Sequence, residues 1–233
     1  MTASVTGTGS GAPAALQVVW RWSARARRLS LRVSRLDGKI TLTVPQGVPE
    51  RIAQAFVDER QDWLRRALDG LPARCAVHAG AALPCEGRDL IITPAPIRHA
   101  RVEGARLLVP QSRAAGPAVR VFLQWLARDR LAQRVDHHAG RLGRAAGRLT
   151  LRDTRSRWGS CNAAGDLMFS WRLVMAPPAV LDYVAAHEVA HLAHMDHSPA
   201  FWAAVARLLP DYATPRRWLR DHGGGLHRYD FTG

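Results

Sequence analysis

The sequence of 233 residues lacks several features that mark whole classes of protein. No apolar run is long enough to span a bilayer, so we expect no membrane partner. Residues 1–19 contain neither the charged segment nor the apolar segment of a signal peptide, and we expect a disordered tail there. The 3 cysteines form no recognisable disulfide framework and leave one unpaired, which is typical of a reducing compartment. These absences together predict a cytoplasmic protein.

Lysine is also scarce, since Lys39 is the only one in a chain with a formal net charge of +14. Arginines carry the charge and are scattered from Arg21 to Arg228 rather than gathered in one run. A basic balance of this kind fits a nucleic-acid partner bound through an arginine-rich surface, but the scatter of the arginines favours side chains that are simply solvated. The 47% of hydrophobic residues suffices for a sizeable core.

The stretch with the clearest chemistry is YVAAHEVAHLAHMDHSPAFW, residues 183–202. On a helix, His187 and His191 lie one turn apart on the same face, where two imidazoles can bind one metal ion. Glu188 follows the first histidine and can serve as general base for a metal-activated water. The alternative is an amphipathic helix that carries these residues by chance. However, the apolar flanks predict a buried helix, in which an unpaired carboxylate would be costly.

Two histidines compete for the third position on the metal. His194 lies seven residues after His187, or about 10 Å along a straight helix, whereas two ligands of one zinc ion lie within about 4 Å of each other. The sequence offers a helix break before Ser198 and Pro199, which suit the N-cap and first turn of a new helix. We therefore predict that a turn brings His197 back over the metal, with His194 exposed or supporting the ligands.

The periodicity of the remaining chain predicts a mixed α and β protein. The elements expected before the metal helix are a β-hairpin within 20–45, a helix over 49–69, two or three strands within 78–110, a long helix over 117–146, a strand over 149–153 and a return strand over 167–174. The metal helix starts at Pro177-Pro178. After it we expect a helix from Pro199 to about Pro210 and a short helix from Pro215 to His222. Phe201 and Trp202 are expected to pack against the metal helix and fix the angle of His197.

Several stretches in combination resemble one known family. They are RARRLSLRVSR, GKITLTVPQGV, DWLRR, SRWGSC, LDYV, HEVAH and HSPAFW. Together they are similar to the YgjP-like metallopeptidases, predicted zinc-dependent hydrolases with relatives among the SprT-like and Spartan-like proteases. The resemblance covers about residues 20–223. Ser170 departs from it, since asparagine would be expected there.

The resemblance implies an α+β fold with a zincin-like (minigluzin-type) metallopeptidase core and a β-rich N-terminal part. It implies zinc on His187, His191 and His197, with Glu188 as general base. The predicted organisation is a tail over 1–19, the N-terminal part over 20–112, the core over 113–225 and a loose tail over 226–233.

The predicted function is therefore zinc-dependent hydrolysis of peptide bonds in a protein or peptide substrate. Tyr183, one turn before His187, and Arg157, in the preceding hairpin, are candidate donors to the oxyanion. Trp158 is a candidate for substrate contact, although core packing is the competing interpretation. The alternative functions are a nucleic-acid-associated, DNA-dependent protease and a basic binding protein with a structural zinc. Imidazole ligands also suit other divalent metals.

Overall fold

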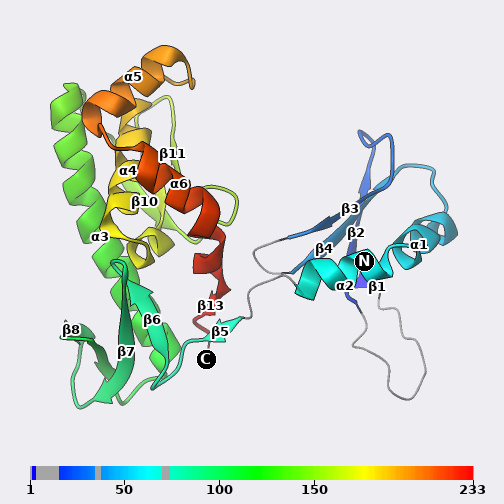
Figure 1. The fold of residues 1–233 in the computed structure, drawn as a ribbon, viewed down its shortest axis with the longest axis horizontal. Helices are drawn as coiled ribbons and strands as arrows, with labels where there is room; N and C mark the ends of the chain where they lie inside the picture. The colour runs from blue at the N-terminus through cyan, green and yellow to red at the C-terminus, as the bar shows by residue number, and fades with distance from the viewer. Residues whose placement is uncertain (1, 4–15, 35–37, 70–73, 233) are drawn as a thin grey trace. The chain divides into compact units, whose positions relative to one another are not determined.

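A computed structural model of the chain describes residues 2–3, 16–34, 38–69 and 74–232 (Figure 1). The chain forms two compact units, Met1–Ala73 and Arg74–Gly233. The division at residues 112 and 113 that the sequence suggested between functional parts stays a prediction. None of the helices in the described ranges is long and apolar enough to cross a lipid bilayer.

The first unit is built on a four-stranded sheet in the order β1-β2-β4-β3. The strands are β1 (Thr2–Ala3), β2 (Val18–Ser23), β3 (Ser30–Val33) and β4 (Ile40–Pro45). β3 and β4 are antiparallel, with Leu31 opposite Leu42, so the predicted hairpin is confirmed. Asp37, in the predicted turn of this hairpin, lies outside the described residues. β1 lies within residues 1–19, which were predicted to be a disordered tail, and β2 begins inside this segment at Val18. That prediction is therefore wrong at the described residues.

Two helices follow this sheet where the sequence predicted one helix. They are α1 (Glu50–Asp58) and α2 (Gln61–Asp69). The break between them is marked by a hydrogen bond of the 3-10 type, which spans three residues instead of four. It runs from the backbone N–H of Arg60 to the carbonyl of Val57 at 3.0 Å. The core of this unit includes Leu42, Val44 and Leu64, each fully buried.

The second unit begins with a four-stranded sheet in the order β6-β7-β9-β8. Its strands are β6 (Ala82–Cys85), β7 (Arg88–Ala95), β8 (Arg101–Glu103) and β9 (Arg106–Pro110). The prediction of two or three strands here was one or two strands short. Leu83, Leu90, Ile92 and Leu107 are buried, so this sheet shares a core with the helices that follow.

The long helix α3 (Ala115–Leu142) joins this sheet to the remaining elements. It ends at Gly143, whose φ of 71° is the left-handed conformation that glycine adopts readily at the end of a helix. Its first half contacts β9, and near its end Arg141 donates to the carbonyls of Arg207 and Leu208 (Figure 1). The sheet and the C-terminal helices therefore lie towards opposite ends of α3.

A second, three-stranded sheet lies ahead of the histidine helix. It has the order β10-β12-β11 and consists of β10 (Leu149–Arg152), β11 (Gly159–Cys161) and β12 (Leu167–Ser170). The strand predicted over 149–153 is β10, but it lies parallel to β12 rather than returning from it in a hairpin. The antiparallel partner of β12 is β11, which was not predicted as a strand. The predicted return strand stops at Ser170 because the next five residues form a 3-10 helix, η1 (Trp171–Met175), which is buried on all sides. Since every side chain there is buried, its apolar run could not be distinguished from a strand by periodicity.

The last helices are α4 (Pro178–Ala190), α5 (Pro199–Leu208), α6 (Ala213–His222) and the 3-10 helix η2 (Gly223–Arg228). A bond of 2.7 Å between His138 Nε2 and Asp182 Oδ1 links α3 to α4. Burial alone would raise the pKa of Asp182, but the hydrogen bond to His138 and the positive charge nearby hold it below its usual value. No local pattern indicates this pair, since its members lie 44 residues apart.

The C-terminal segment is packed, so the prediction of a loose tail is wrong. β13 (Tyr229–Asp230) pairs in parallel with β5 (Cys75–Ala76). The buried guanidinium of Arg172 donates to the carbonyls of Leu226 and Tyr229 at 3.0 and 3.1 Å, and its other nitrogens donate to Asp153 at 2.6 and 3.1 Å. One arginine thus holds the C-terminal segment and the chain after β10 together.

Candidate metal centre

The helix α4 presents the first histidine and the glutamate from a buried position. Ala185, Ala186, Val189 and Ala190 on the same helix are fully buried. The helix ends at Ala190, and His191 is its C-cap with helical backbone angles. The one-turn spacing of His187 and His191 predicted from the sequence is therefore present, and their ring centroids lie 5.1 Å apart.

The turn after α4 brings His197 back to these two rings. Asp196 accepts a hydrogen bond from the backbone N–H of Ser198 at 3.2 Å, and the Ser198 hydroxyl accepts one from Phe201 N at 3.4 Å. Ser198 is thus the N-cap of α5, as predicted, with Pro199 in the first turn. Nε2 of His197 lies 3.2 Å from Nε2 of His187, and the ligand atoms of all three histidines lie within 4.8 Å of one another.

His194 does not join this group through its side chain. Its backbone carbonyl lies 2.9 Å from Nδ1 of His191. When Nδ1 carries the proton and donates it to this carbonyl, Nε2 of His191 is left with a free lone pair, which is the arrangement usual for metal-binding histidines. The side chain of His197, and not that of His194, therefore lies with His187 and His191, while their roles as metal ligands stay a prediction.

Aromatic side chains of α5 hold the three imidazoles. Phe201 is fully buried, and its ring lies 4.9 Å from His187, 4.5 Å from His191 and 4.9 Å from His197. Trp202 stacks on His197 at 6.0 Å and lies 5.7 Å from His187. These contacts confirm the prediction that the two residues pack against the histidine helix and fix the third ring.

The electrostatics of the group suit a cation. Burial, helped by the neighbouring imidazoles and by Arg216, lowers the pKa of His187 to about 4. Burial also lowers the pKa of His191, against the opposing effect of its hydrogen bond to the His194 carbonyl. Both rings are therefore neutral at pH 7, as a metal ligand must be.

The spacing of the group fits one ion. Two nitrogens on one zinc ion lie within about 4 Å of each other, so the 3.2 Å between His187 and His197 already matches. The three rings are close enough for a small side-chain adjustment to complete a three-nitrogen site.

Glu188 is buried beside the group, with 5% of its surface exposed. Burial raises the pKa of its carboxyl to about 7, and the charge of Arg157 partly opposes this. No side-chain hydrogen bond of Glu188 is formed with the described residues, so its proton-binding oxygens are not committed to another protein group. A carboxyl with a pKa near neutrality can both accept and return a proton.

Gly159 on β11 gives this carboxyl its space. A Cβ atom at residue 159 would lie 2.5 Å from Oε1 and 2.6 Å from Cγ of Glu188. Any side chain there would collide with the carboxylate. This residue was not among those predicted from the sequence, although glycine inside a strand pattern is a known sign of close approach by another group.

The other predicted site residues lie around this centre in different ways. Tyr183 is buried, its ring lies 5.9 Å from that of His187, and burial raises the pKa of its phenol. Its hydroxyl forms no hydrogen bond within the described residues. Arg157 is exposed, with its charge acting on Glu188. Trp158 packs against His227 at 5.0 Å, which agrees with its interpretation as a packing residue.

Arg216 is a neighbour of the centre that was not predicted from the sequence. Its guanidinium lies 4.3 Å above the ring of Trp202, and its charge contributes to the low pKa of His187. Ser170, noted for departing from the family pattern, is fully buried, and its hydroxyl has no hydrogen-bond partner in the described residues. The structure assigns no role to this hydroxyl.

Comparisons with known proteins bear on the family of this chain. One solved structure that matches is described as the crystal structure of the metallopeptidase zymogen of Pyrococcus abyssi abylysin, at 18% identity and a TM-score of 0.36, covering 39% of this chain and 93% of that one. A likeness of this extent carries no argument about fold or activity. The curated proteins gave no significant match. The family described as YgjP-like, metallopeptidase domain, matches residues 27–222, which is most of the sequence. The chain therefore belongs to the YgjP-like metallopeptidase family.

Proposed function

We propose that this protein is a zinc-dependent metallopeptidase that hydrolyses peptide bonds, with a zincin-like (minigluzin-type) core within residues 113–225. The observation that carries the proposal is the convergence of three imidazoles, with ligand atoms within 4.8 Å of one another, next to a buried carboxyl. Membership of a metallopeptidase family supports the same reaction class.

His187, His191 and His197 would hold the metal, and a three-nitrogen set leaves a coordination position open, as catalytic zinc sites require. When bound, zinc would supply a Lewis acid that lowers the pKa of water and polarises the scissile carbonyl. His191 is oriented for this by the His194 carbonyl, and His197 by its packing against Phe201 and Trp202. Contacts with other protein groups would therefore orient these two ligand side chains for the metal.

Glu188 is the general base in this proposal. It would take a proton from the attacking water and pass it to the leaving amine as the peptide bond breaks. Its pKa of about 7 supports both steps, because proton transfer is most effective when the pKa of the group lies near the working pH. Tyr183 and Arg157 are the candidate donors to the oxyanion. The packing of Trp158 favours a supporting role for it rather than substrate contact.

The strand β11 is the proposed binding edge for an extended substrate. In the sheet order β10-β12-β11 it pairs with β12 on one side only. An extended peptide can add to such an edge through backbone hydrogen bonds. Since Gly159 on β11 lies against Glu188, a peptide on this edge would run beside the proposed base. This supports protein segments in extended conformation as substrates.

The alternative functions gain nothing from the structure or the comparisons. Neither gives a reason to propose a nucleic-acid partner, and the arginines of the chain are compatible with simple solvation. A structural zinc would not require a buried glutamate beside the histidines, whereas a hydrolase would use one.

The experiment that tests this function is the substitution Glu188→Gln. Glutamine keeps the shape of the side chain and loses the base. We expect the variant to retain the metal content of the wild-type protein and to lose hydrolysis of an unfolded protein such as casein. The matched control is Glu59→Gln, an exposed glutamate of the first unit, which should leave both unchanged. Undiminished hydrolysis by Glu188→Gln would disprove the role of Glu188, and absence of hydrolysis by the metal-loaded wild-type protein would count against the peptidase assignment.

A further inference from the structure

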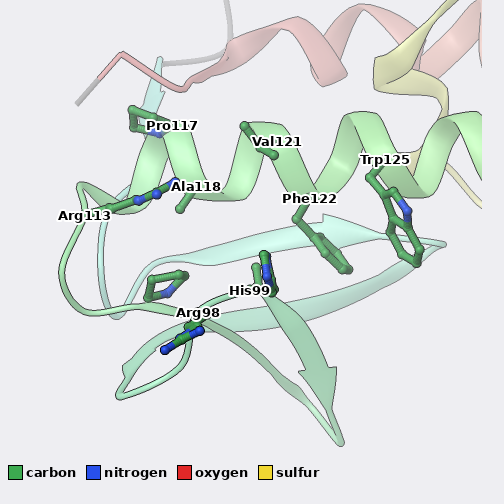
Figure 2. A pocket seen from close by; sticks show the side chains of 10 residues that line it. Arg98, His99, Arg113, Pro117, Ala118, Val121, Phe122 and Trp125 are labelled. Atoms are coloured by element: carbon green, nitrogen blue, oxygen red, sulfur yellow. The ribbon is translucent and has the colours of Figure 1, made fainter.

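The second unit contains a cavity of about 460 Å³ between the first half of α3 and the chain around β8 and β9 (Figure 2). This volume lies within the range of small-molecule sites, about 300–1,000 Å³. Five of its lining residues decide its chemistry, namely Arg98, Arg113, Val121, Phe122 and Trp125. None of them belongs to the metal centre, which is built at the C-terminal end of α4 and in the turn after it.

The apolar side of the cavity is unusually exposed. Val121 and Trp125 each keep 63% of their surface exposed, whereas Phe122 between them is 8% exposed and lies at the base. The ring of Phe122 lies 6.2 Å from that of Trp125. An apolar ligand lying on these side chains would remove them from water, which favours binding.

The polar side of the cavity consists of two arginines, with His99 also in the lining. Figure 2 shows Arg98 and Arg113 towards one end of the cavity, with Trp125 at the other. Among the described residues neither guanidinium has a hydrogen bond or an ion pair, while the one carboxylate of the β8–β9 hairpin, Glu103, is paired with Arg101 at 2.7 Å. The positive charge of Arg98 and Arg113 is therefore not neutralised within the second unit.

We propose that this cavity binds a small amphipathic carboxylate, with its carboxylate group between Arg98 and Arg113 and its apolar body over Val121, Phe122 and Trp125. The guanidinium group matches a carboxylate with two parallel hydrogen bonds, and aromatic side chains supply the apolar surface. The separation of charge at one end from apolar surface at the other requires the same polarity in the ligand. A hydrophobic ligand without charge would leave the arginines unused, and a highly charged ligand would leave the aromatic side chains exposed.

The test uses decanoate, a straight-chain carboxylate, with the full-length protein. We expect titration calorimetry to detect saturable binding of decanoate below its aggregation concentration, accompanied by a change in tryptophan fluorescence. Decyltrimethylammonium, which has the same chain and the opposite charge, should bind at least about tenfold more weakly. Equal binding of the two probes, or no binding of decanoate, would overturn the proposal.

Substitutions then locate the site. Arg98→Gln and Arg113→Gln should each weaken decanoate binding roughly tenfold, the loss expected for one charge-assisted hydrogen bond. Arg120→Gln, on α3 but outside the cavity lining, is the matched control and should bind as the wild-type protein does. Trp125→Ala should abolish the fluorescence change and weaken binding, whereas Trp22→Ala, which removes an exposed tryptophan of the first unit, should leave the affinity unchanged. Because all five substituted side chains are exposed, these variants should fold.

Two further measurements distinguish binding in this cavity from binding at the metal centre and from binding of a protein segment. Glu188→Gln and removal of metal with a chelator should leave decanoate binding intact, since the cavity shares no residue with the metal centre. Loss of binding in either case would overturn the proposal by placing decanoate at the metal. Binding of an acidic, apolar peptide in the absence of any decanoate binding would likewise overturn it, because the occupant would then be a protein segment.

Discussion

Adding a single methyl group at Gly159 tests whether the position of Glu188 governs catalysis. The substitution Gly159→Ala places a Cβ atom 2.5 Å from Oε1, 2.6 Å from Cγ and 2.8 Å from the carboxyl carbon of Glu188. In protein structures a Cβ atom essentially never lies closer than 3.0 Å to such a neighbouring atom. Either the strand or the carboxylate must therefore move. Because Glu188 is 5% exposed and lies on a buried helix, it has little space into which to move.

The magnitude follows from this geometry. Forcing an extra methyl group into a packed site typically costs about 1–3 kcal/mol of stability. A displacement of a reacting group by about 1 Å can lower a rate about a hundredfold. We therefore expect kcat to fall about a hundredfold and KM to change by less than about threefold, since alanine keeps every backbone hydrogen-bonding group of the proposed substrate-binding edge.

The assay combines steady-state hydrolysis of a peptide with metal content and thermal unfolding. Metal content should match the wild-type protein, because the three atoms nearest to a Cβ atom at residue 159 all belong to Glu188 and not to a histidine. Gly140→Ala is the matched control, since a Cβ atom at Gly140 meets nothing within 4 Å. In a Glu188→Ala background the stability cost of Gly159→Ala should disappear because the colliding side chain is gone. Wild-type kcat in Gly159→Ala, or an equal stability cost in both backgrounds, would refute the reasoning.

Three further predictions concern stability and binding. In metal-free protein the raised pKa of Glu188, about 7 against a usual 4.5, means that its contribution to stability is complete below about pH 4.5 and lost as the pH rises through 7. Thermal unfolding should therefore show that the stability of Glu188→Gln relative to the wild-type protein increases by about 2–3 kcal/mol between about pH 5 and pH 8. A difference in stability that stays constant over this range would contradict the prediction. The pH dependence that His187 contributes has the opposite sign, and it cancels in the comparison because both proteins contain His187. Asp182→Ala leaves the buried His138 without its hydrogen-bond partner. Denaturant titrations should show that the free energy of unfolding falls by about 1.5–3 kcal/mol, and a fall of less than about 0.5 kcal/mol would contradict this. Ser198→Ala removes the N-cap of α5 and should cost about 0.5–1 kcal/mol and weaken zinc binding in a chelator competition, whereas unchanged zinc affinity would show that the cap does not position His197.

The three-histidine cluster was largely predictable from the sequence because its signals are local. The spacing of His187 and His191 needs only helical geometry. The choice of His197 over His194 needed only the helix break that Ser198 and Pro199 indicate, and the structure has Ser198 as the N-cap of α5. Phe201 and Trp202 were predicted to pack against the histidine helix because they follow this break in the apolar face of the next helix.

The residues that were not predicted from the sequence depend on contacts between distant parts of the chain. Gly159 acquires its importance only when β11 lies against α4, and no local pattern gives that distance. The pair of His138 and Asp182 spans 44 residues, and the bonds from Arg172 to the C-terminal segment span 54 and 57. Pairing across such separations is set by the tertiary fold rather than by periodicity.

The errors in secondary structure have similar causes. β2 was missed because its burial follows no simple alternation: Val18 is buried, whereas Arg21 and Trp22 are exposed. Its place is set by parallel pairing with β4, which lies later in the chain. The C-terminal segment looked loose because its polar composition hides Tyr229 and Phe231, which are buried in the core of the second unit.

The central claim is that His187, His191 and His197 together bind one metal ion, and the most direct test is the zinc stoichiometry of three proteins measured by mass spectrometry after dialysis. The wild-type protein and His194→Ala should each retain about one zinc per chain, because His194 contributes only its backbone carbonyl. His197→Ala should lose stoichiometric zinc while keeping its fold by circular dichroism. Retention of one zinc with wild-type affinity in His197→Ala would contradict this claim.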